Sequence, residues 1–308
     1  MSDQHNQWPS LPLQAWVDTK ETLHRYCQIV GKIRLALVPF RNHWWHVTLY
    51  VDTRGLTTGP MPVADGRTIE IKFDFVAHHL ILSTSDGAVE SFPIIDGLTC
   101  MDFYTKVFNA LHNLRANVSI NPAPYELDGP LLSADRDHRT YEADSVAQFW
   151  RILLRVADVL GDFAGWFNGK QSPVHLFWHS FDLAMARFSG RPAPTRPDAN
   201  RVNREAYSHE VIAFGFWAGD DRVPYPAFYS YTAPAPPTLT AQPLRPAGSV
   251  WDAEARMALL PYEVVRAARD PRSVLLEFLT SAYEAGAESA HWDVAEFATS
   301  ADPRARRT

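Results

Sequence analysis

The greatest concentration of reactive side chains in this chain lies in the tract from Ser172 to Phe188. It sets four ionisable residues among large apolar ones: His175, His179, Asp182 and Arg187. Ionisable groups in a buried segment need hydrogen-bonding or charged partners, or they serve a function. The tract therefore marks where a site is expected, although it does not name a reaction.

We predict that residues 174–188 run as one extended strand, with the side chains aimed into a shared interior hollow. Alternation along a strand then puts His175, His179 and Arg187 on one face and Asp182 on the other. An arginine on an apolar strand can bind a carboxylate or phosphate through two hydrogen bonds. It can equally form a structural ion pair with a carboxylate from another strand.

His175 and His209 are the candidate acid/base groups, and Asp182 or Glu210 is expected to orient an imidazole. Glu210 directly follows His209, and neighbours on a strand face opposite ways. One of the two therefore enters a pocket while the other pairs elsewhere. A buried polar bridge without a function is the alternative.

The expected ligand contacts combine positive charge with aromatic surface. Arg187 and Lys32 would neutralise an anion. Aromatic and phenolic side chains would line the pocket: Trp44, His46, Tyr229 and Tyr231. Such walls suit sugars, aromatic compounds and cations, and they also suit ordinary core packing.

Two histidine pairs have spacings that invite comparison with metal sites, namely His43 with His46 and His175 with His179. On a strand, residues four apart are separated by roughly 13 Å, whereas both imidazoles must lie ~2.0–2.1 Å from a shared ion. Residues three apart point to opposite faces. We predict no metal site from these pairs; histidines from different strands, such as His175 with His209, would be needed.

Composition limits the partners and the location of the protein. The chain has 308 residues, a formal charge of −6 and 46% hydrophobic residues, and its one basic cluster is Arg304–Arg307. We therefore expect no nucleic-acid partner. No apolar run approaches the ~20 residues of a membrane helix, so no membrane partner is expected. Cys27 and Cys100 give no disulfide framework, which favours a cytoplasmic location.

Familiar catalytic signatures are absent from the sequence. It contains no G-x-G-x-x-G, P-loop, G-x-S-x-G, H-E-x-x-H or kinase motif. These absences remove most support for the common nucleotide-handling and hydrolase families. No particular cofactor and no oligomeric state are indicated.

The elements predict an α+β fold, with mainly antiparallel strands and helices packed on one side. Four helices are expected to begin near Asp18, Thr99, Ser145 and Asp270, each marked by a capping pattern. Strands are expected over 47–51, 69–75, 81–82, 89–94, 174–188, 210–217 and 228–232.

The order of elements suggests two related halves, residues 1–130 and 131–308, fused as one compact unit about a pseudo-twofold axis. Each half reads helix, strands, helix. Trp45-His46 precedes Arg54 as Trp178-His179 precedes Arg187, and Gly-Lys at 31–32 and 169–170 follows a helix in both. The site is expected between the halves. Chance matching in an aromatic-rich chain is the alternative.

The chain resembles DUF5996, a family of uncharacterised bacterial proteins, along nearly its whole length. The matching stretches are Trp8 to Trp16, Thr22-Leu23-His24, Gln28 to Lys32, Asn42 to Trp45, Gly169-Lys170, Ser172 to His175, Phe181-Asp182-Leu183, Arg187 to Arg191, Ala206 to Glu210, Phe228 to Tyr231, Leu260 to Glu263, and Trp292-Asp293. The resemblance implies a single full-length unit and no established activity. Members tend to carry glycine where His179 stands, which weakens His179 as a catalytic group, and Ala218 replaces a proline.

Taken together, these features favour an enzyme that acts on a small polar or anionic molecule by histidine-based acid/base chemistry. Two other functions use the same residues: a non-catalytic small-molecule-binding protein and a histidine-based metal-dependent enzyme. A protein-interaction module would instead show a large exposed apolar patch.

Overall fold

The computed structural model describes residues 8–194 and 197–303. Its helices are α1 (Val17–Leu37), α2 (Cys100–Asn113), α3 (Ala143–Gly165), α4 (Arg201–Ala206), α5 (Tyr262–Arg266), α6 (Pro271–Ser289) and α7 (Val294–Phe297), with short 3-10 helices η1 (Leu13–Ala15), η2 (Asn42–Trp44) and η3 (Leu239–Ala241). In these ranges, no helix is long and apolar enough to cross a membrane.

The first antiparallel sheet has the order β1-β2-β4-β5-β6, with β3 also paired to β4. Its strands are β1 (Tyr50–Val51), β2 (Gly55–Thr57), β3 (Met61–Pro62), β4 (Thr68–Asp74), β5 (His79–Thr84) and β6 (Val89–Pro93). Ile69, Ile71 and Phe73 are buried, as the alternation of β4 predicts. Phe103 of α2 stacks on Tyr26 of α1 with ring centroids 4.0 Å apart, so the two helices share this core.

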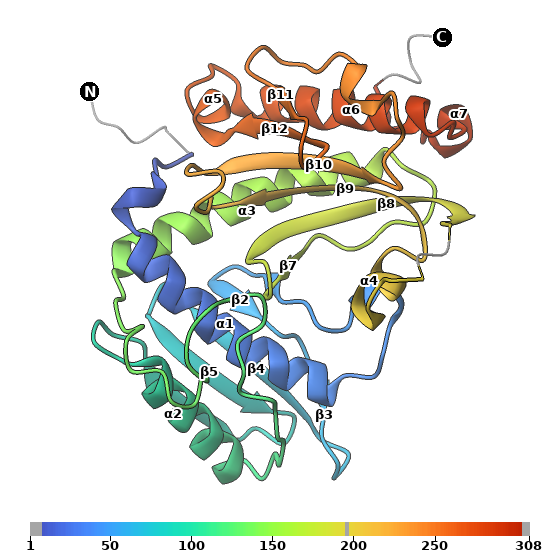
Figure 1. Cartoon of the computed structure of the whole chain (residues 1–308). Helices are drawn as coiled ribbons and strands as arrows, with labels where there is room; N and C mark the ends of the chain where they lie inside the picture. Colours follow the sequence, from blue (N-terminus) through green and yellow to red (C-terminus); the bar gives the residue numbers. More distant parts are fainter. Residues whose placement is uncertain (1–7, 195–196, 304–308) are drawn as a thin grey trace.

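The second antiparallel sheet has the order β11-β12-β10-β9-β8-β7. Its strands are β7 (His175–Phe177), β8 (Asp182–Pro192), β9 (His209–Trp217), β10 (Ala227–Ala233), β11 (Val250–Asp252) and β12 (Met257–Pro261). Helices α3 and α6 pack on one face, here called the helix face (Figure 1). The opposite face, here called the open face, carries Asp182, Ala184, Phe188, Gly215, Tyr229 and Tyr231. The α+β class with antiparallel sheets is confirmed.

Two of the predicted helix starts, at Thr99 and Asp270, have the predicted side-chain caps. The Thr99 hydroxyl accepts a hydrogen bond from the Asp102 backbone N–H at 3.0 Å, and Asp270 accepts one from the Ser273 N–H at 3.1 Å. The capping box predicted at Asp18 is wrong, because α1 begins one residue earlier and no side chain caps it.

The tract at residues 174–188 is a hairpin, and the prediction of one continuous strand is wrong. β7 ends at Phe177, and a turn leads into β8, which begins at Asp182. Phe181 adopts a left-handed backbone with φ of 57°. The aromatic residues of the turn, Trp178 and Phe181, are themselves buried. The hydrophobic pattern therefore continues through the turn and does not show that the chain changes direction.

The hairpin changes which side chains share a face. His175 pairs with Ala184 and Phe177 with Asp182, so His175 and Asp182 both lie on the open face. Arg187 lies on the helix face. The prediction that His175 and Arg187 share a face is therefore wrong, because the turn shifts the alternation by one residue.

The β7–β8 turn joins the two halves of the chain. The Trp178 ring packs directly on Gly31 of α1, and its indole N–H donates to the Val47 carbonyl at 2.8 Å. Beside it, Leu49 and Leu176 exchange two backbone hydrogen bonds of 2.9 and 2.8 Å. These contacts set the two sheets side by side.

Phe181 completes this junction from the other side of the turn. Its ring stacks on His24 of α1 and on Phe149 of α3, with centroids 5.0 and 5.2 Å away. One hydrophobic cluster contains buried residues of both sheets. The boundary at residue 130 stays a prediction.

Both sheets run mainly as meanders between two long helices, α1 and α2 in the first half and α3 and α6 in the second (Figure 1). The Trp-His pairs that suggested duplication do not occupy equivalent positions in the two sheets. His46 precedes β1, whereas His179 follows β7. Lys32 lies inside α1, whereas Lys170 follows α3. Internal duplication stays a prediction.

Replacing Gly31 by alanine should destabilise the protein, because the new Cβ would overlap the Trp178 ring. We expect the free energy of unfolding to fall by about 1–3 kcal/mol, as overpacking does elsewhere. Urea denaturation measures this change. Gly161→Ala is the matched control within α3: its Cβ would meet no atom within 4 Å, and it should stabilise by about 0.5–1 kcal/mol. Equal effects of the two substitutions would contradict the proposed role of the Trp178–Gly31 contact.

Candidate functional site

Asp182, the first residue of β8, places a buried carboxylate on the open face, and the residue is 8% exposed. One oxygen accepts a hydrogen bond from the Tyr229 hydroxyl and the other from the Ser180 hydroxyl. Within the described part of the chain, Asp182 forms no ion pair. A buried carboxylate with only hydroxyl partners favours an external positive group.

Gly215 makes the contact between Tyr229 and Asp182 possible. Tyr229 lies on β10 and Asp182 on β8, with Gly215 of β9 between them. A Cβ on Gly215 would lie 2.5 Å from atoms of the Tyr229 ring. The missing side chain therefore allows the ring to lie across β9 and deliver its hydroxyl to the carboxylate.

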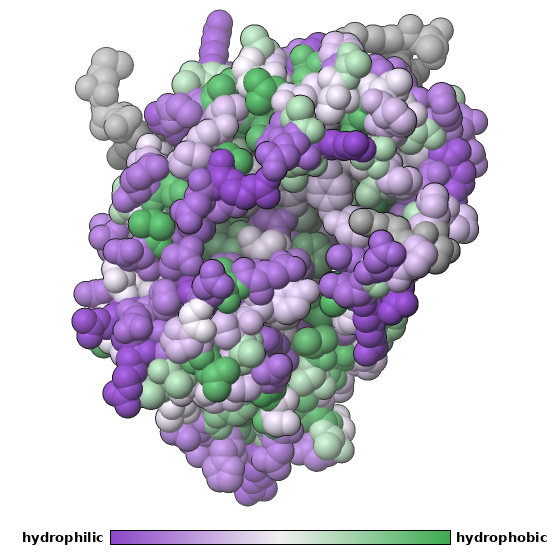
Figure 2. Space-filling model, viewed as in Figure 1, coloured by the Kyte–Doolittle hydropathy of each residue, from purple (hydrophilic) through white to green (hydrophobic). Residues whose placement is uncertain are grey.

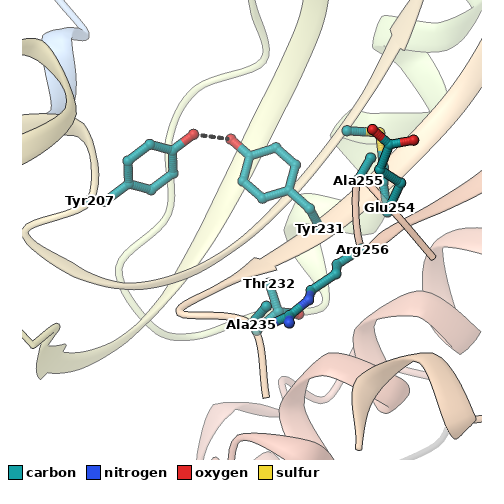
Figure 3. A pocket seen from close by; sticks show the side chains of 8 residues that line it. Tyr207, Tyr231, Thr232, Ala235, Glu254, Ala255 and Arg256 are labelled. Atoms are coloured by element: carbon teal, nitrogen blue, oxygen red, sulfur yellow. Dashed lines mark hydrogen bonds between the residues drawn. The ribbon is translucent and has the colours of Figure 1, made fainter. Parts of the chain in front are cut away.

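Tyr229, Tyr231 and Tyr207 form a set that we call the tyrosine cluster. The rings of Tyr229 and Tyr231 are nearly parallel, with centroids 6.1 Å apart. The hydroxyls of Tyr231 and Tyr207 lie 3.3 Å apart (Figure 3). Burial raises the pKa of Tyr229 and of Tyr231 well above the ordinary value, so both phenols stay neutral near pH 7.

A cavity of about 300 Å³ borders the tyrosine cluster. Its walls are Tyr207, Tyr231, Thr232, Ala235, Glu254, Ala255, Arg256 and Met257 (Figure 3). Glu254 and Arg256 come from the turn between β11 and β12. The volume is at the lower end of the range for small-molecule sites.

The molecular surface is also hollowed in front of β8 and β9, with hydrophobic residues inside and hydrophilic residues around the rim (Figure 2). The open face of these strands carries mostly small side chains here: Ala184, Ala186, Ala213 and Gly215. The Tyr229 ring covers Gly215, whereas the two alanines at 184 and 186 keep the surface low along β8 next to Asp182.

A second cluster, here called the Lys170 cluster, lies where β8 passes Phe188. The imidazole of His43 donates from Nδ1 to the Ala206 carbonyl at 3.2 Å, which assigns its tautomer. Its Nε2 then accepts from the Lys170 amine at 2.6 Å. The amine lies 4.9 Å from the Phe188 ring centroid, and the His209 ring is 5.8 Å from that of His43.

His175 lies on the open face but is sealed, with 1% of its surface exposed. Tyr50 and Phe177 pack on its ring. Burial, with a smaller contribution from the Arg34 charge, lowers its pKa to about 3. The imidazole is neutral near pH 7 and does not border the cavity.

Arg187 is fully buried on the helix face. Its guanidinium lies 3.6 Å from the Phe163 ring centroid and 4.6 Å from that of Tyr283, and it donates to the Phe163 carbonyl. The sheet itself separates it from Asp182. The structure therefore does not bring Arg187 to a ligand on the open face.

His209 and Glu210 diverge, as neighbours on β9 should. One Glu210 oxygen accepts from Ser189 and Arg191 at 2.9 Å and from the Trp292 indole at 3.0 Å. Glu210 therefore accepts hydrogen bonds that link β8, β9 and the segment after α6, and it does not orient an imidazole. Among the described residues, Asp182 also accepts no hydrogen bond from an imidazole, so neither carboxylate has the orienting role expected from the sequence.

The remaining predicted contact residues lie near the junction of the halves. The Lys32 amine is 5.6 Å from the Trp178 ring centroid, and burial lowers its pKa. Trp44 donates to the Val202 carbonyl at 3.0 Å, which ties η2 to α4. His46 stacks on Trp44 with centroids 5.6 Å apart.

Three residues at these sites were missed from the sequence: Ser180, Tyr207 and Lys170. Each lies in or beside a quoted family motif, but periodicity gave no reason to bring them together. Among residues 8–194 and 197–303, no group of three or more His, Cys, Asp or Glu side chains is placed to hold a metal ion.

A family model described as a family of unknown function, DUF5996, matches residues 8–299. No curated protein and no solved structure matches the chain.

Acid should destabilise the protein through its buried histidines. Burial lowers the pKa of His24 to about 4 and that of His175 to about 3, whereas unfolded histidine titrates near 6.5. Below pH 6.5 the unfolded chain binds protons that the folded chain excludes, so stability is full above 6.5 and is lost as the pH falls toward 3. Each pH unit in this window costs about 1.4 kcal/mol per histidine.

Urea denaturation at pH 7, 6 and 5 measures this slope. His175→Leu should make the slope between pH 6 and pH 5 shallower by up to about 1.4 kcal/mol per pH unit, because one excluded proton is removed. His112→Gln, a change at an exposed position, is the control and should leave it unchanged. A His175→Leu protein with the wild-type slope would show that His175 is already accessible to protons.

Proposed function

The chain belongs to the DUF5996 family, and we propose that it binds a small organic cation on the open face of its second sheet. The observation that carries the proposal is the buried Asp182 carboxylate, which has two hydroxyl partners and no ion pair in the described part of the chain. Burying an uncompensated negative charge is costly. An ammonium group supplied by a ligand would offset that cost.

The surroundings of Asp182 suit a cation in two further ways. The Tyr229 ring lies beside the carboxylate, with the Trp217 ring 5.5 Å away and the Tyr231 ring 6.1 Å away. Aromatic faces attract ammonium groups, most strongly where water is excluded. The net charge of −6 also favours the approach of cations.

The space available fits a small ligand rather than a macromolecule. The cavity of about 300 Å³ is lined by Tyr231 (Figure 3), whose ring is 6.1 Å from that of Tyr229, the partner of Asp182. A ligand with an amine at Asp182 can extend a hydroxyl or apolar group toward the tyrosine cluster.

This proposal differs from the anionic ligand that the sequence suggests. Arg187 is sealed on the helix face, and Lys32 packs on Trp178. Histidine-based acid/base catalysis is the second candidate function, and the observation that favours it is the contact between His43 and Lys170. Enzymatic activity and a cytoplasmic location stay predictions.

Replacing Asp182 by asparagine should weaken binding of small ammonium compounds, because the amide keeps the shape and removes the charge. We expect a loss of at least ~10-fold, the usual scale for one charge-assisted contact. Calorimetric titration with a panel of primary amines, tetramethylammonium and matched carboxylates measures it. Tyr229→Phe should lower affinity less, since it keeps the ring.

The control is Glu288→Gln, which removes an exposed carboxylate on α6. It should leave binding unchanged and so exclude a general effect of net charge. Binding of carboxylates in preference to amines, or amine affinity unchanged in Asp182→Asn, would refute the proposal.

A further inference from the structure

We propose that Lys170 is an amine nucleophile that forms an imine with a small aldehyde or ketone, with His43 as its proton acceptor. The proposal is independent of the cation site, because it rests on the Lys170 cluster and uses neither Asp182 nor the tyrosine cluster.

The geometry of the pair is that of a nucleophile and its base. Nζ of Lys170 lies 2.6 Å from Nε2 of His43, within hydrogen-bonding distance for proton transfer. The opposite nitrogen of the ring donates to the Ala206 carbonyl at 3.2 Å. That bond keeps the proton on Nδ1 and directs the Nε2 lone pair at the amine.

Burial, without a paired carboxylate among the described residues, lowers the pKa of Lys170, whereas the two aromatic rings beside the amine favour its charged form. The rings of Phe188 and Trp45 lie 4.9 and 5.6 Å from Nζ, and within the described ranges the amine has no ion pair. Burial lowers the pKa of Lys170 and is the main cause that lowers the pKa of His43. Glu205 opposes this effect on the lysine, but its contribution is smaller than that of burial.

The backbone that carries His43 is held in an uncommon conformation. His43 and Trp44 both have left-handed backbones, with φ of 54° and 62°. Glu205 accepts from the His43 N–H at 3.0 Å, and Trp44 donates to the Val202 carbonyl at 3.0 Å, so α4 fixes this segment. Two consecutive non-glycine residues in this region are a costly arrangement that is enriched at functional sites.

The other four lysines of the chain lack this arrangement. Lys20 pairs with Glu21 at 2.9 Å, and Lys72 has carboxylate partners that include Asp52 at 3.4 Å. Lys106 is exposed. Lys32 is buried against Trp178, but no imidazole contact is found for its amine within the described residues. Lys170 alone among these five described lysines combines a depressed pKa with an adjacent base.

The reaction balances with the carbonyl compound as the only co-reactant. His43 takes one proton from the Lys170 ammonium, and the freed amine adds to the carbonyl carbon to give a carbinolamine. His43 returns the proton to the departing hydroxyl, so the C–O bond breaks and water leaves. A protonated imine remains on Nζ. Lys170 is only partly buried, which leaves its amine open to a small reagent.

Reductive labelling of the full chain tests the proposal. The protein is incubated with benzaldehyde and cyanoborohydride near pH 7, and peptide mass spectrometry follows the modification rate at each lysine. We expect Lys170 to react at least about 10-fold faster than Lys106, a small part of what a positioned base can supply. Lys32 should react more slowly than Lys170, because it is buried without a base.

Two variants separate chemistry from structure. His43→Gln keeps a hydrogen-bond acceptor near the amine but cannot take a proton, so the rate at Lys170 should fall to about that at Lys106. The slow rate at the buried Lys32 should not change, which reports an intact fold. Lys170→Arg should abolish the fast modification. A Lys170 rate no greater than that of Lys106, or one that survives in His43→Gln, overturns the proposal and assigns the contact to structure.

Discussion

The packing of Trp178 on Gly31 is the contact on which the arrangement of this molecule depends. A side chain at position 31 would hold the β7–β8 turn away from α1. Beside the turn, Leu49 and Leu176 form a bridge that joins β7 to the first half. The same turn delivers Asp182 to the start of β8, so the junction of the halves and the placement of the carboxylate have one origin.

The two clusters on the open face differ in the size of the strand residue beside them. At one end, Gly215 lets the Tyr229 ring cross a strand and reach Asp182. At the other end, Phe188 is large and forms a wall beside the Lys170 amine. The open face therefore presents polar groups near Gly215 and an apolar ring at Phe188. This difference separates the proposed cation site from the Lys170 amine.

Much of the fold could be predicted from the sequence, because it rests on local signals. Thr99 and Asp270 mark helix starts through their own hydrogen bonds, and the alternation of Ile69, Ile71 and Phe73 determines a buried face. The site could not be predicted in the same way. The hydrophobic pattern of a buried turn resembles that of a strand, so alternation predicts the wrong face for Arg187. The contact between Lys170 and His43 joins residues 127 positions apart, and no local pattern predicts it.

β8 has an unbroken register against β9 from Asp182 to Phe188. At ~3.3 Å per residue, the backbone from Asp182 to Phe188, which packs beside the Lys170 amine, spans about 20 Å. Small compounds would thus load the two ends independently, and a single molecule could occupy both only if it were long, extended and differently functionalised at its two tips.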